Sequence, residues 1–328
     1  MKNIFLFTIM ALVLTSLAPG GAAAASAISF VEPTPDDGAT IEDTSVEIQA
    51  SIIESALADV KFNWDGTDYW LYDDSLVLMF NFDNVAALGK NYSAAGDIVK
   101  DLSGLNNHGY LSDETIDPAK VPEWISYGKY GGAFDFTGNG VDSGQSILVP
   151  HSDSLNPGSG DFAIAVWILT RHDYDGDILR KGSTGTATTW YKIEHSPSAN
   201  NNKIGLNFNT DGTDALFASA AAYNDEQWHF VVAQRKGNQA ELWIDGLLDG
   251  TASVTGSISN TANLAVGSKD TQNDDFINSS LDEVRIYMRS FSQGEIKELY
   301  YSNLNKYDID KWTLYVNQSN LSDETTYT

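Results

Sequence analysis

Short apolar or alternating segments recur along most of this chain, with glycine, asparagine or aspartate between them. Alternation of apolar and polar residues with a period of two is typical of a strand that buries one face. The segments concerned are 146–150, 161–168, 177–180, 190–194 and 203–208. Regularly spaced short strands with turns between them favour an all-β sandwich over alternating strand and helix units.

Two further segments support the same fold class. Residues 75–82 form an unbroken apolar run of strand length, which suits a strand that is buried on both faces. Residues 228–235 and 239–244 predict a hairpin, and the pair Asp245 and Gly246 predicts a tight turn into another strand. Together with the segments above, they predict that the central part of the chain is all β.

One helix is predicted near the end of this central part. Ser292 and Glu295 form a capping box, in which each side chain can bond the backbone N–H of the other residue. Ile296, Leu299 and Tyr300 then fall on one helical face. We expect this helix to close an edge or an end of the sandwich.

The two flanks of the central part are also rich in strand patterns. In segment 45–52 apolar residues occupy every second position, and segments 60–64 and 69–72 predict a hairpin. Segment 311–317 alternates in the same way. Because domain insertion at a loop tip is tolerated, we expect 28–75 and 304–328 to form one immunoglobulin-like module around an inserted domain, 76–303. Two unrelated β-rich flanks are the alternative.

The start of the chain has the three regions of a secretory signal. Lys2 is followed by the apolar run 4–17 and by small residues up to Ala27. This order predicts a signal peptide over 1–27 and therefore a secreted or cell-surface protein. A membrane anchor is the weaker interpretation, because the run is shorter than the ~20 residues that span a bilayer. The rest of the sequence has no apolar run of membrane-spanning length, so the mature chain is not expected to span a membrane. The chain ends within a strand-like segment, which predicts that it is part of a longer surface polypeptide.

Composition narrows the possible partners. The chain has no cysteine, which excludes disulfides and a lipid attached through an N-terminal cysteine. Its formal net charge of −26 comes from acidic residues that are spread along the chain. Such a charge argues against nucleic acid and anionic membranes as partners, and its default interpretation is a solvated acidic surface.

The order of motifs in 76–303 resembles one family. A strand that begins Trp228-His229, the Asp-Gly hairpin near 242–246 and the closing run 278–299 occur in the order of laminin-G-like (LamG-like), concanavalin-A-like lectin/glucanase domains. The resemblance implies a jelly-roll β-sandwich of two antiparallel sheets in a prokaryotic, archaeal or bacterial, cell-surface protein. It also implies an extracellular glycan or protein ligand bound through rim loops. Segment 136–142 departs from the family pattern at one rim of the expected ligand face.

The resemblance also implies a structural calcium ion. Strands from the two ends of such a domain lie side by side, and this would bring Asp83 and Asp282 together. Calcium prefers several hard oxygens, which these acidic loops supply. The alternative is that Asp282 caps a segment or pairs with Arg285 or Lys297.

Candidate ligand-binding residues are aromatic or planar polar side chains in or beside predicted loops. They are Asp101, Asn106, Asn107, His108, Tyr174, Trp190 and Tyr191. In an exported chain, asparagines in Asn-x-Ser triplets are glycosylation candidates. These are Asn91, Asn278, Asn317 and Asn320.

No catalytic pattern is present, so we predict a protein that is not an enzyme. The sequence lacks the Glu-x-Asp-x-x-Glu strand of related glucanases, and the adjacent Asp282 and Glu283 would point to opposite faces of a strand. The histidines show no zinc-ligand spacing. The prediction is a secreted, non-enzymatic recognition module that calcium stabilises. The alternatives are a structural spacer of a surface-layer or adhesin protein and a glycoside hydrolase.

Overall fold

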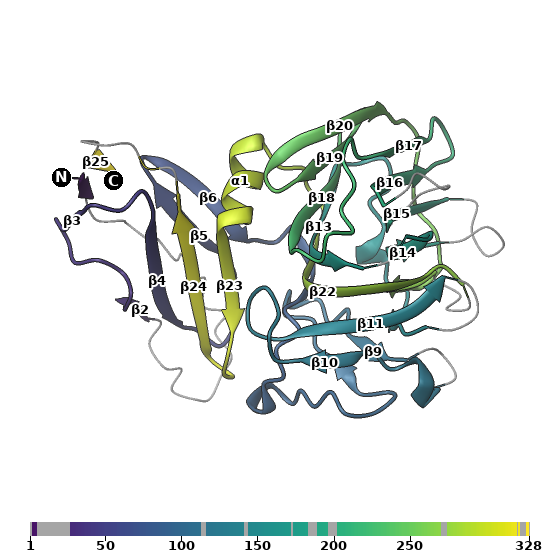
Figure 1. Cartoon of the computed structure of the whole chain (residues 1–328), viewed down its shortest axis with the longest axis horizontal. Helices are drawn as coiled ribbons and strands as arrows, with labels where there is room; N and C mark the ends of the chain where they lie inside the picture. The colour runs from purple at the N-terminus through teal and green to yellow at the C-terminus, as the bar shows by residue number, and fades with distance from the viewer. Residues whose placement is uncertain are drawn as a thin grey trace, which may run out of the picture. The chain divides into compact units, whose positions relative to one another are not determined.

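A computed structural model of the chain (Figure 1) describes residues 2–4, 27–112, 116–140, 144–171, 173–182, 189–195, 202–269, 274–319, 321 and 326–327. It divides into two compact units. The central unit is Ser75–Gln293, and the flanking unit combines Met1–Asp74 with Gly294–Thr328. Most of the predicted signal peptide, 5–26, lies outside the described residues. Within the described ranges, no helix is both long and apolar enough to cross a membrane.

The central unit contains two eight-stranded sheets whose paired strands are antiparallel. Sheet I has the order β10-β11-β22-β13-β18-β19-β20, and β7 also pairs with β22. Its strands are β7 (Leu76–Phe80), β10 (Glu123–Ile125), β11 (Ala133–Gly140), β13 (Phe162–Thr170), β18 (His229–Lys236), β19 (Gln239–Ile244), β20 (Leu247–Ser253) and β22 (Phe276–Tyr287).

Sheet II has the order β17-β16-β15-β14-β21-β12-β9-β8. Its strands are β8 (Ile98–Val99), β9 (Gly109–Leu111), β12 (Ile147–Val149), β14 (Gly176–Lys181), β15 (Trp190–His195), β16 (Ile204–Asn209), β17 (Ala215–Ala218) and β21 (Leu264–Val266). Three short 3-10 helices, η1 (Ala86–Leu88), η2 (Pro118–Lys120) and η3 (Asp153–Leu155), lie in the connections that are described. The predicted fold class, an all-β sandwich of two antiparallel sheets, is confirmed.

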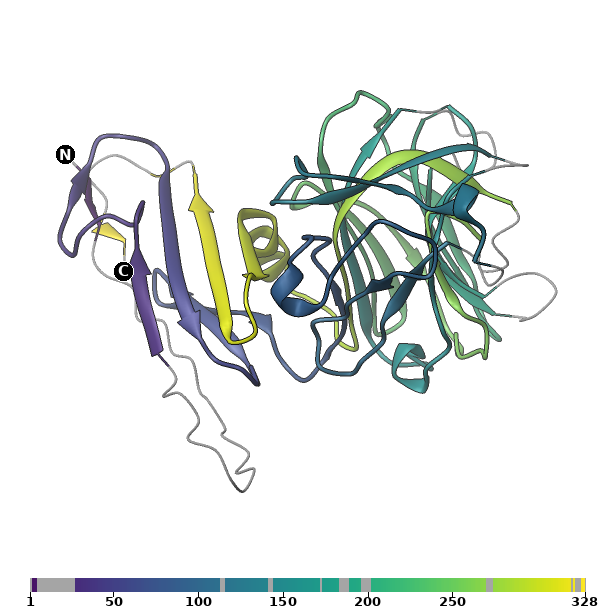
Figure 2. The same cartoon turned by 90° about the horizontal axis from the view of Figure 1, so that it is seen from below.

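The core lies between the two sheets, which face each other in Figure 2. Alternation along the strands selects its residues: Tyr191 and Ile193 of β15 belong to the core, and so do Ile164 and Val166 of β13. Side chains at the intervening positions of β15 therefore point away from the core. This alternation puts a separate set of polar residues on the outward face of sheet II.

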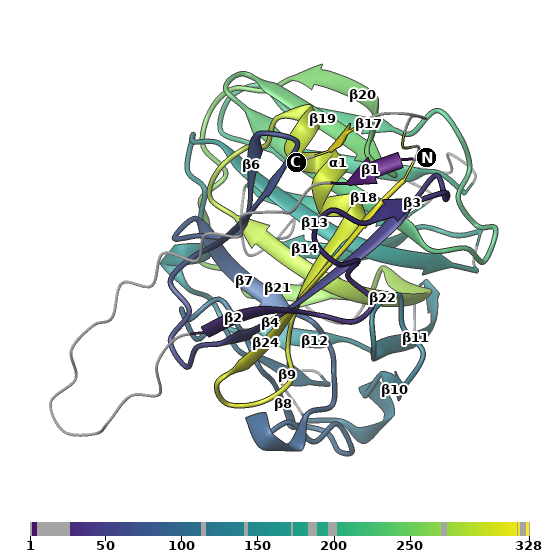
Figure 3. The same ribbon diagram turned by 90° about the vertical axis from the view of Figure 1, so that its left-hand side faces the viewer.

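The flanking unit contains a four-stranded sheet with the order β2-β4-β24-β23. β4 (Val46–Ile53) and β24 (Lys311–Gln318) run side by side and antiparallel (Figures 1 and 3), so segments from both flanks share one sheet. The other elements are β2 (Ala27–Val31), β23 (Ser302–Lys306), the hairpin β5 (Val60–Trp64) and β6 (Thr67–Tyr72), and a small sheet of β1 (Lys2–Ile4), β3 (Thr40–Ile41) and β25 (Thr326–Tyr327). The immunoglobulin-like assignment of this unit stays a prediction.

The predicted helix is α1 (Gln293–Tyr301), and it buries Ile296 and Leu299 as the pattern indicated. From Gly294 onward the chain groups with the flanking unit rather than with the sandwich. That the helix closes an edge or an end of the sandwich stays a prediction.

Candidate functional site

One row of residues crosses the outward face of sheet II. Backbone pairing places Arg180 opposite Lys192 and Lys192 opposite Asn207. Continued to both edges of the sheet, the row comprises Ile98, Tyr110, Leu148, Ala265, Arg180, Lys192, Asn207 and Leu216. We call it the outward row. Its ends are exposed, since Ile98 is 37% and Leu216 55% accessible, whereas Arg180 and Lys192 at its centre are buried.

Arg180 and Lys192, at the centre of the outward row, form a compact ionic network with three acidic residues beside the row. Lys192 Nζ lies 2.9 Å from Asp177 Oδ1 and also bonds Glu194 Oε2. Arg180 Nη1 lies 3.0 Å from the other oxygen of Asp177 and 3.5 Å from Asp275 Oδ2. Three carboxylates therefore share two cations in a region that is largely removed from water. Buried charges of this kind persist only when they are paired.

Burial changes the protonation of two of these acids. It raises the pKa of Glu194 to about 7, although Lys192 beside it acts in the opposite direction. Burial also raises the pKa of Asp275 to about 6, and the charge of Asp177 adds to the effect. Burial alone would lower the pKa of Lys192, but Asp177 and Glu194 hold it above its usual range. Glu194 Oε1 is buried and has no hydrogen-bond partner among the described residues.

An aromatic side chain lies next to this network. Trp190 is half-buried, and the guanidinium carbon of Arg180 lies 5.2 Å from its ring centroid. Its Nε1 donates a hydrogen bond of 3.1 Å to Asn207 Oδ1. The site therefore combines an aromatic ring, an amide, two cations and a buried acceptor. These are the groups that recognise polar ligands with apolar faces.

The predicted loop 101–109 is held together by its own side chains. The Asp101 carboxylate accepts N–H bonds of 2.8 to 2.9 Å from Met79, Ser103 and Asn107. Asn107 Nδ2 donates to the Val77 carbonyl at 2.7 Å. Asp101 and Asn107 are both buried, so they build the loop rather than offer a binding surface.

Two other candidates in this loop are more accessible. Asn106 is exposed and adopts a φ of 59°, a left-handed conformation that asparagine tolerates better than most residues. His108 is half-buried, and its Nδ1 accepts the N–H of Asp101 at 3.1 Å. Burial lowers the pKa of His108 and therefore favours the neutral ring. Neither residue belongs to the outward row.

The two tyrosine candidates lie in different places. Tyr191 is fully buried in the core and donates its hydroxyl to the Leu155 carbonyl at 3.1 Å. Its placement beside a binding loop is therefore corrected: the strand alternation that exposes Trp190 turns its neighbour inward. Tyr174 donates its hydroxyl to the Gly138 carbonyl at 2.5 Å, and burial raises its pKa to about 12. Tyr174 thus ties its loop to β11.

Asp83 and Asp282, the predicted calcium ligands, both contact the glycine-rich turn 128–132. Asp282 Oδ2 accepts the N–H of Tyr130 at 2.9 Å, and Asp83 Oδ1 accepts the N–H of Gly132 at 2.7 Å. A Cβ on Gly131 would lie 2.1 Å from Asp83 Oδ1, which explains a glycine at this close approach. The structure therefore brings the two carboxylates to one turn, as the resemblance implied.

The carboxylate oxygens of both residues accept N–H groups, whereas calcium takes 6–8 oxygen ligands. The remaining oxygens also accept N–H groups, Asp83 Oδ2 from Asn81 Nδ2 at 3.0 Å and Asp282 Oδ1 from Glu283 at 2.8 Å. Within the described ranges, no three acidic or histidine side chains are arranged to hold a metal ion. Burial, and then Glu283, raises the pKa of Asp282 well above its usual range. Calcium at this turn stays a prediction.

The glycosylation candidates differ in accessibility. Asn91 is exposed in the connection that follows η1. Asn278 in β22 and Asn317 in β24 are half-buried within strands. Asn320 lies outside the described residues. Asn91 is therefore the described candidate that is best placed for modification.

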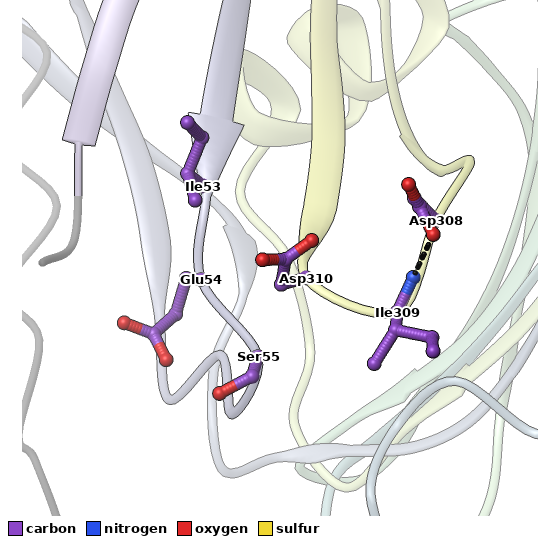
Figure 4. Close-up of a pocket in the computed structure, with 6 residues that line it drawn as sticks. All are labelled: Ile53, Glu54, Ser55, Asp308, Ile309 and Asp310. Atoms are coloured by element: carbon purple, nitrogen blue, oxygen red, sulfur yellow. Dashed lines mark hydrogen bonds between the residues drawn. The ribbon is translucent and has the colours of Figure 1, made fainter. Parts of the chain in front are cut away.

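The flanking unit has a pocket of about 330 Å³ (Figure 4). It is lined by Ile53, Glu54, Ser55, Asp308, Ile309 and Asp310. Asp308 accepts the N–H of Ile309 and the ammonium of Lys311, both at 2.8 Å. A Glu54 oxygen accepts the N–H of Ala56 at 2.9 Å. These acids stabilise their own loops, so the outward row is the stronger candidate site.

Sequence reasoning missed most of the ionic network. Asp177, Arg180, Lys192, Glu194, Asn207 and Asp275 were not among the predicted site residues. One signal was available, because alternation along 190–194 puts Trp190, Lys192 and Glu194 on the same face. That β14 and β16 would flank this strand could not be seen from the alternation alone.

Comparison with known proteins identifies relatives of the central unit. Residues 141–297 match a family model described as the concanavalin A-like lectin/glucanases superfamily. The binding domain of Paraclostridial Mosquitocidal Protein 1 superposes with a TM-score of 0.52 and 16% identity, covering 71% of this chain and 54% of that chain. The chain thus spans about half of that domain. No curated protein matches the chain.

Two further solved structures have TM-scores just below one half. Domain 4 of AbnA, a GH43 extracellular arabinanase from Geobacillus stearothermophilus, was solved in complex with arabinotriose. It has a TM-score of 0.49 and 14% identity, with 69% of this chain and 98% of that chain covered. The binding domain of botulinum neurotoxin DC in complex with SialylT has a TM-score of 0.49 and 18% identity, with 71% and 53% covered. At such identities a likeness shows the fold alone.

Proposed function

We propose that the central unit is a recognition domain that binds a glycan at Trp190, beside the centre of the outward row. The match of residues 141–297 to the concanavalin A-like lectin/glucanases family model supports this proposal. The proposed setting is outside the cell, which the signal-like start of the sequence supports. The observation that carries the proposal is the position of Trp190 beside Arg180 and Asn207.

The chemistry of these side chains suits a sugar. The apolar face of a pyranose or furanose ring can stack on the indole of Trp190, as apolar groups do on aromatic rings. Sugar hydroxyls can bond the half-buried Asn207 amide beside the ring, while the buried Arg180 holds the indole from its other side. Two cations and three carboxylates leave no positive excess, so the ligand class is a neutral rather than an acidic glycan.

Binding without turnover is the preferred reading of the acids at this site. A glycoside hydrolase needs one carboxylic acid and one carboxylate that flank the scissile bond. Both oxygens of Asp177 are engaged, one by Lys192 and one by Arg180. Asp177 is therefore poorly placed to act as a nucleophile or a base.

Hydrolysis is a second candidate function, because one observation favours it. Burial raises the pKa of Glu194 to about 7, the range in which a carboxylic acid can donate a proton at neutral pH. A hydrolase would release reducing ends from a polysaccharide, and Glu194→Gln would abolish this release while keeping binding. A chain that binds but releases nothing supports recognition alone.

The proposal is tested with the purified mature chain on an array of neutral and acidic glycans. We expect binding to neutral glycans, equal in calcium and in chelator, and loss of that binding in Trp190→Ala. Tyr127→Ala is the matched control, since Tyr127 is an aromatic residue that is 74% exposed and lies outside the strands of sheet II. An array without signal would favour a structural spacer, and undiminished binding by Trp190→Ala would move the site elsewhere.

A further inference from the structure

Three polar residues form a chain inside the central unit, on the core side of the glycine-rich turn. Lys90 Nζ lies 2.5 Å from Asn81 Oδ1, and Asn81 Nδ2 lies 3.0 Å from Asp83 Oδ2. Asn81 is 0%, Lys90 2% and Asp83 8% accessible. An amine, a carboxamide and a carboxylic acid are therefore in consecutive contact away from solvent.

Aromatic rings surround this group. Phe82 and Tyr92 both contact Phe134, with ring centroids 5.0 Å apart in each pair. The Tyr92 hydroxyl is buried and has no hydrogen-bond partner among the described residues. Burial, and then the charge of Asp83, raises the pKa of Tyr92. Apolar ring surface therefore lies close to the Asp83 end of this chain of contacts.

We propose that Lys90 and Asn81 become joined by an intramolecular amide bond between their side chains. After Lys90 Nζ has lost a proton, its lone pair attacks Cγ of Asn81, the atom bonded to the oxygen that Nζ already contacts. The bond between Cγ and Nδ2 then breaks, and Nδ2 leaves as ammonia. One C–N bond forms and one breaks, so the step needs no oxidant, reductant or further reactant.

Asp83 is placed to move the proton that this exchange requires. The attacking amine must lose a proton, and the departing nitrogen must gain one. Asp83 Oδ2 bonds that departing nitrogen, while Oδ1 is fixed by the N–H of Gly132 at 2.7 Å. A positioned carboxyl group can relay the proton as a general acid and base. Asp83 is therefore the catalytic residue of the proposed step.

A second buried lysine provides a matched comparison within the same unit. Lys181 is 0% accessible, and its Nζ lies 2.9 Å from Asn260 Oδ1. Asn260 Nδ2, however, donates to the backbone carbonyls of Thr189 and Ile258 rather than to an acid. Lys181 and Asn260 thus share the amine and the amide but lack a proton relay at the departing nitrogen. We expect this pair to stay unlinked.

Peptide mapping of the purified wild-type chain tests the proposal directly. Trypsin does not cleave after an acylated lysine, so linkage yields one peptide that spans 62–100 and is lighter than its sequence mass by one ammonia. Fragment spectra should show a branch that joins Asn81 to Lys90. Cleavage after Lys181 should proceed normally. Complete cleavage after Lys90, with 62–90 and 91–100 at their sequence masses, would overturn the proposal.

Three substitutions separate linkage from other mass changes. Lys90→Met should restore the sequence mass of the chain, whereas Lys181→Met should keep the loss of one ammonia. Asp83→Asn keeps an acceptor but cannot relay a proton, so the linked fraction should fall strongly. A mass loss that persists in Lys90→Met would contradict the assignment. The wild-type peptide map tests the proposal even if a variant fails to fold.

Discussion

Trp190 and Arg180 lie stacked on adjacent strands of sheet II, with the guanidinium carbon 5.2 Å from the indole centroid. Asn207 accepts the indole N–H from the strand on the other side. The ring is thereby fixed from two directions before any ligand arrives. A pre-oriented aromatic loses little side-chain entropy on binding, which favours affinity.

Asn207→Ala should weaken glycan binding about fivefold, because it removes one hydrogen bond worth ~1 kcal/mol and frees the Trp190 ring. Titration calorimetry with a glycan found on the array measures the change. Asn209→Ala is the control, since Asn209 belongs to the same strand but bonds Asp214 at 2.9 Å. Equal losses in both variants would show that Asn207 has no specific role.

Glu194→Gln should flatten the pH dependence of stability. Burial raises the folded-state pKa of Glu194 to about 7, so the folded state binds a proton that the unfolded state releases at lower pH. This contribution is present below the unfolded pKa of about 4.5 and is lost as pH rises through 7. The difference in unfolding free energy between wild type and variant should change by on the order of 3 kcal/mol across this pH window.

Urea unfolding at pH 4.5 and pH 8 measures that difference. Asp153→Asn is the control, because the Asp153 side chain is fully exposed. If the unfolding free energies of wild type and variant differed by the same amount at both pH values, Glu194 would not titrate in this window.

Asp245→Asn should lower the free energy of unfolding more at pH 6 than at pH 9. The hydrogen bond from His229 Nδ1 to Asp245, 2.7 Å long, raises the pKa of His229. A raised histidine pKa gives stability that is present below the unfolded pKa and lost as pH rises through the folded one. The variant should therefore lose about 2 kcal/mol at pH 6.

Asparagine suits this test because it keeps the acceptor for the N–H of Phe230, which bonds Asp245 at 2.9 Å, and tolerates the φ of 53° at this position. Unfolding free energies at the two pH values measure the effect. An NMR titration of the His229 ring should also show a lower pKa in the variant. Equal losses at both pH values would point to packing rather than to charge.

Asp282→Ala should lower the melting temperature both in calcium and in chelator. The substitution leaves the buried N–H groups of Tyr130 and Glu283 without their acceptor, at ~1–3 kcal/mol each. Differential scanning calorimetry under both conditions measures the change. A loss that appears only with calcium present would restore the calcium site that the family resemblance implied.

Much of the fold could be predicted from local patterns. The apolar run 75–82, the hairpin around 236–238 and the Asp-Gly turn at 245 all appear as β elements, because period-two patterning and turn residues act over a few positions. The pairing of β24 with β4 rests on nothing local, yet matching alternation in both strands made it a reasonable expectation.

The candidate site was harder to predict. Alternation in β15 separates Trp190, Lys192 and Glu194 from Tyr191, so the sequence already distinguishes outward from inward residues there. It does not say that Asp177 and Arg180 will lie beside them, since this depends on the order of strands and on a register shift in β14. Asp101 and Asn107 look like loop ligands in sequence, and only their hydrogen bonds show that they hold the loop together.

By itself, the amino-acid sequence determined the all-β class, the strand positions and the face that each strand buries, because these follow from residue-by-residue propensity and period. Only the tertiary structure decided which polar residues meet. Sheet register brings Lys192 to Asp177, and loop packing brings Lys90 to Asn81. These contacts join residues from different strands or loops, and their energies depend on burial, which a local pattern does not contain.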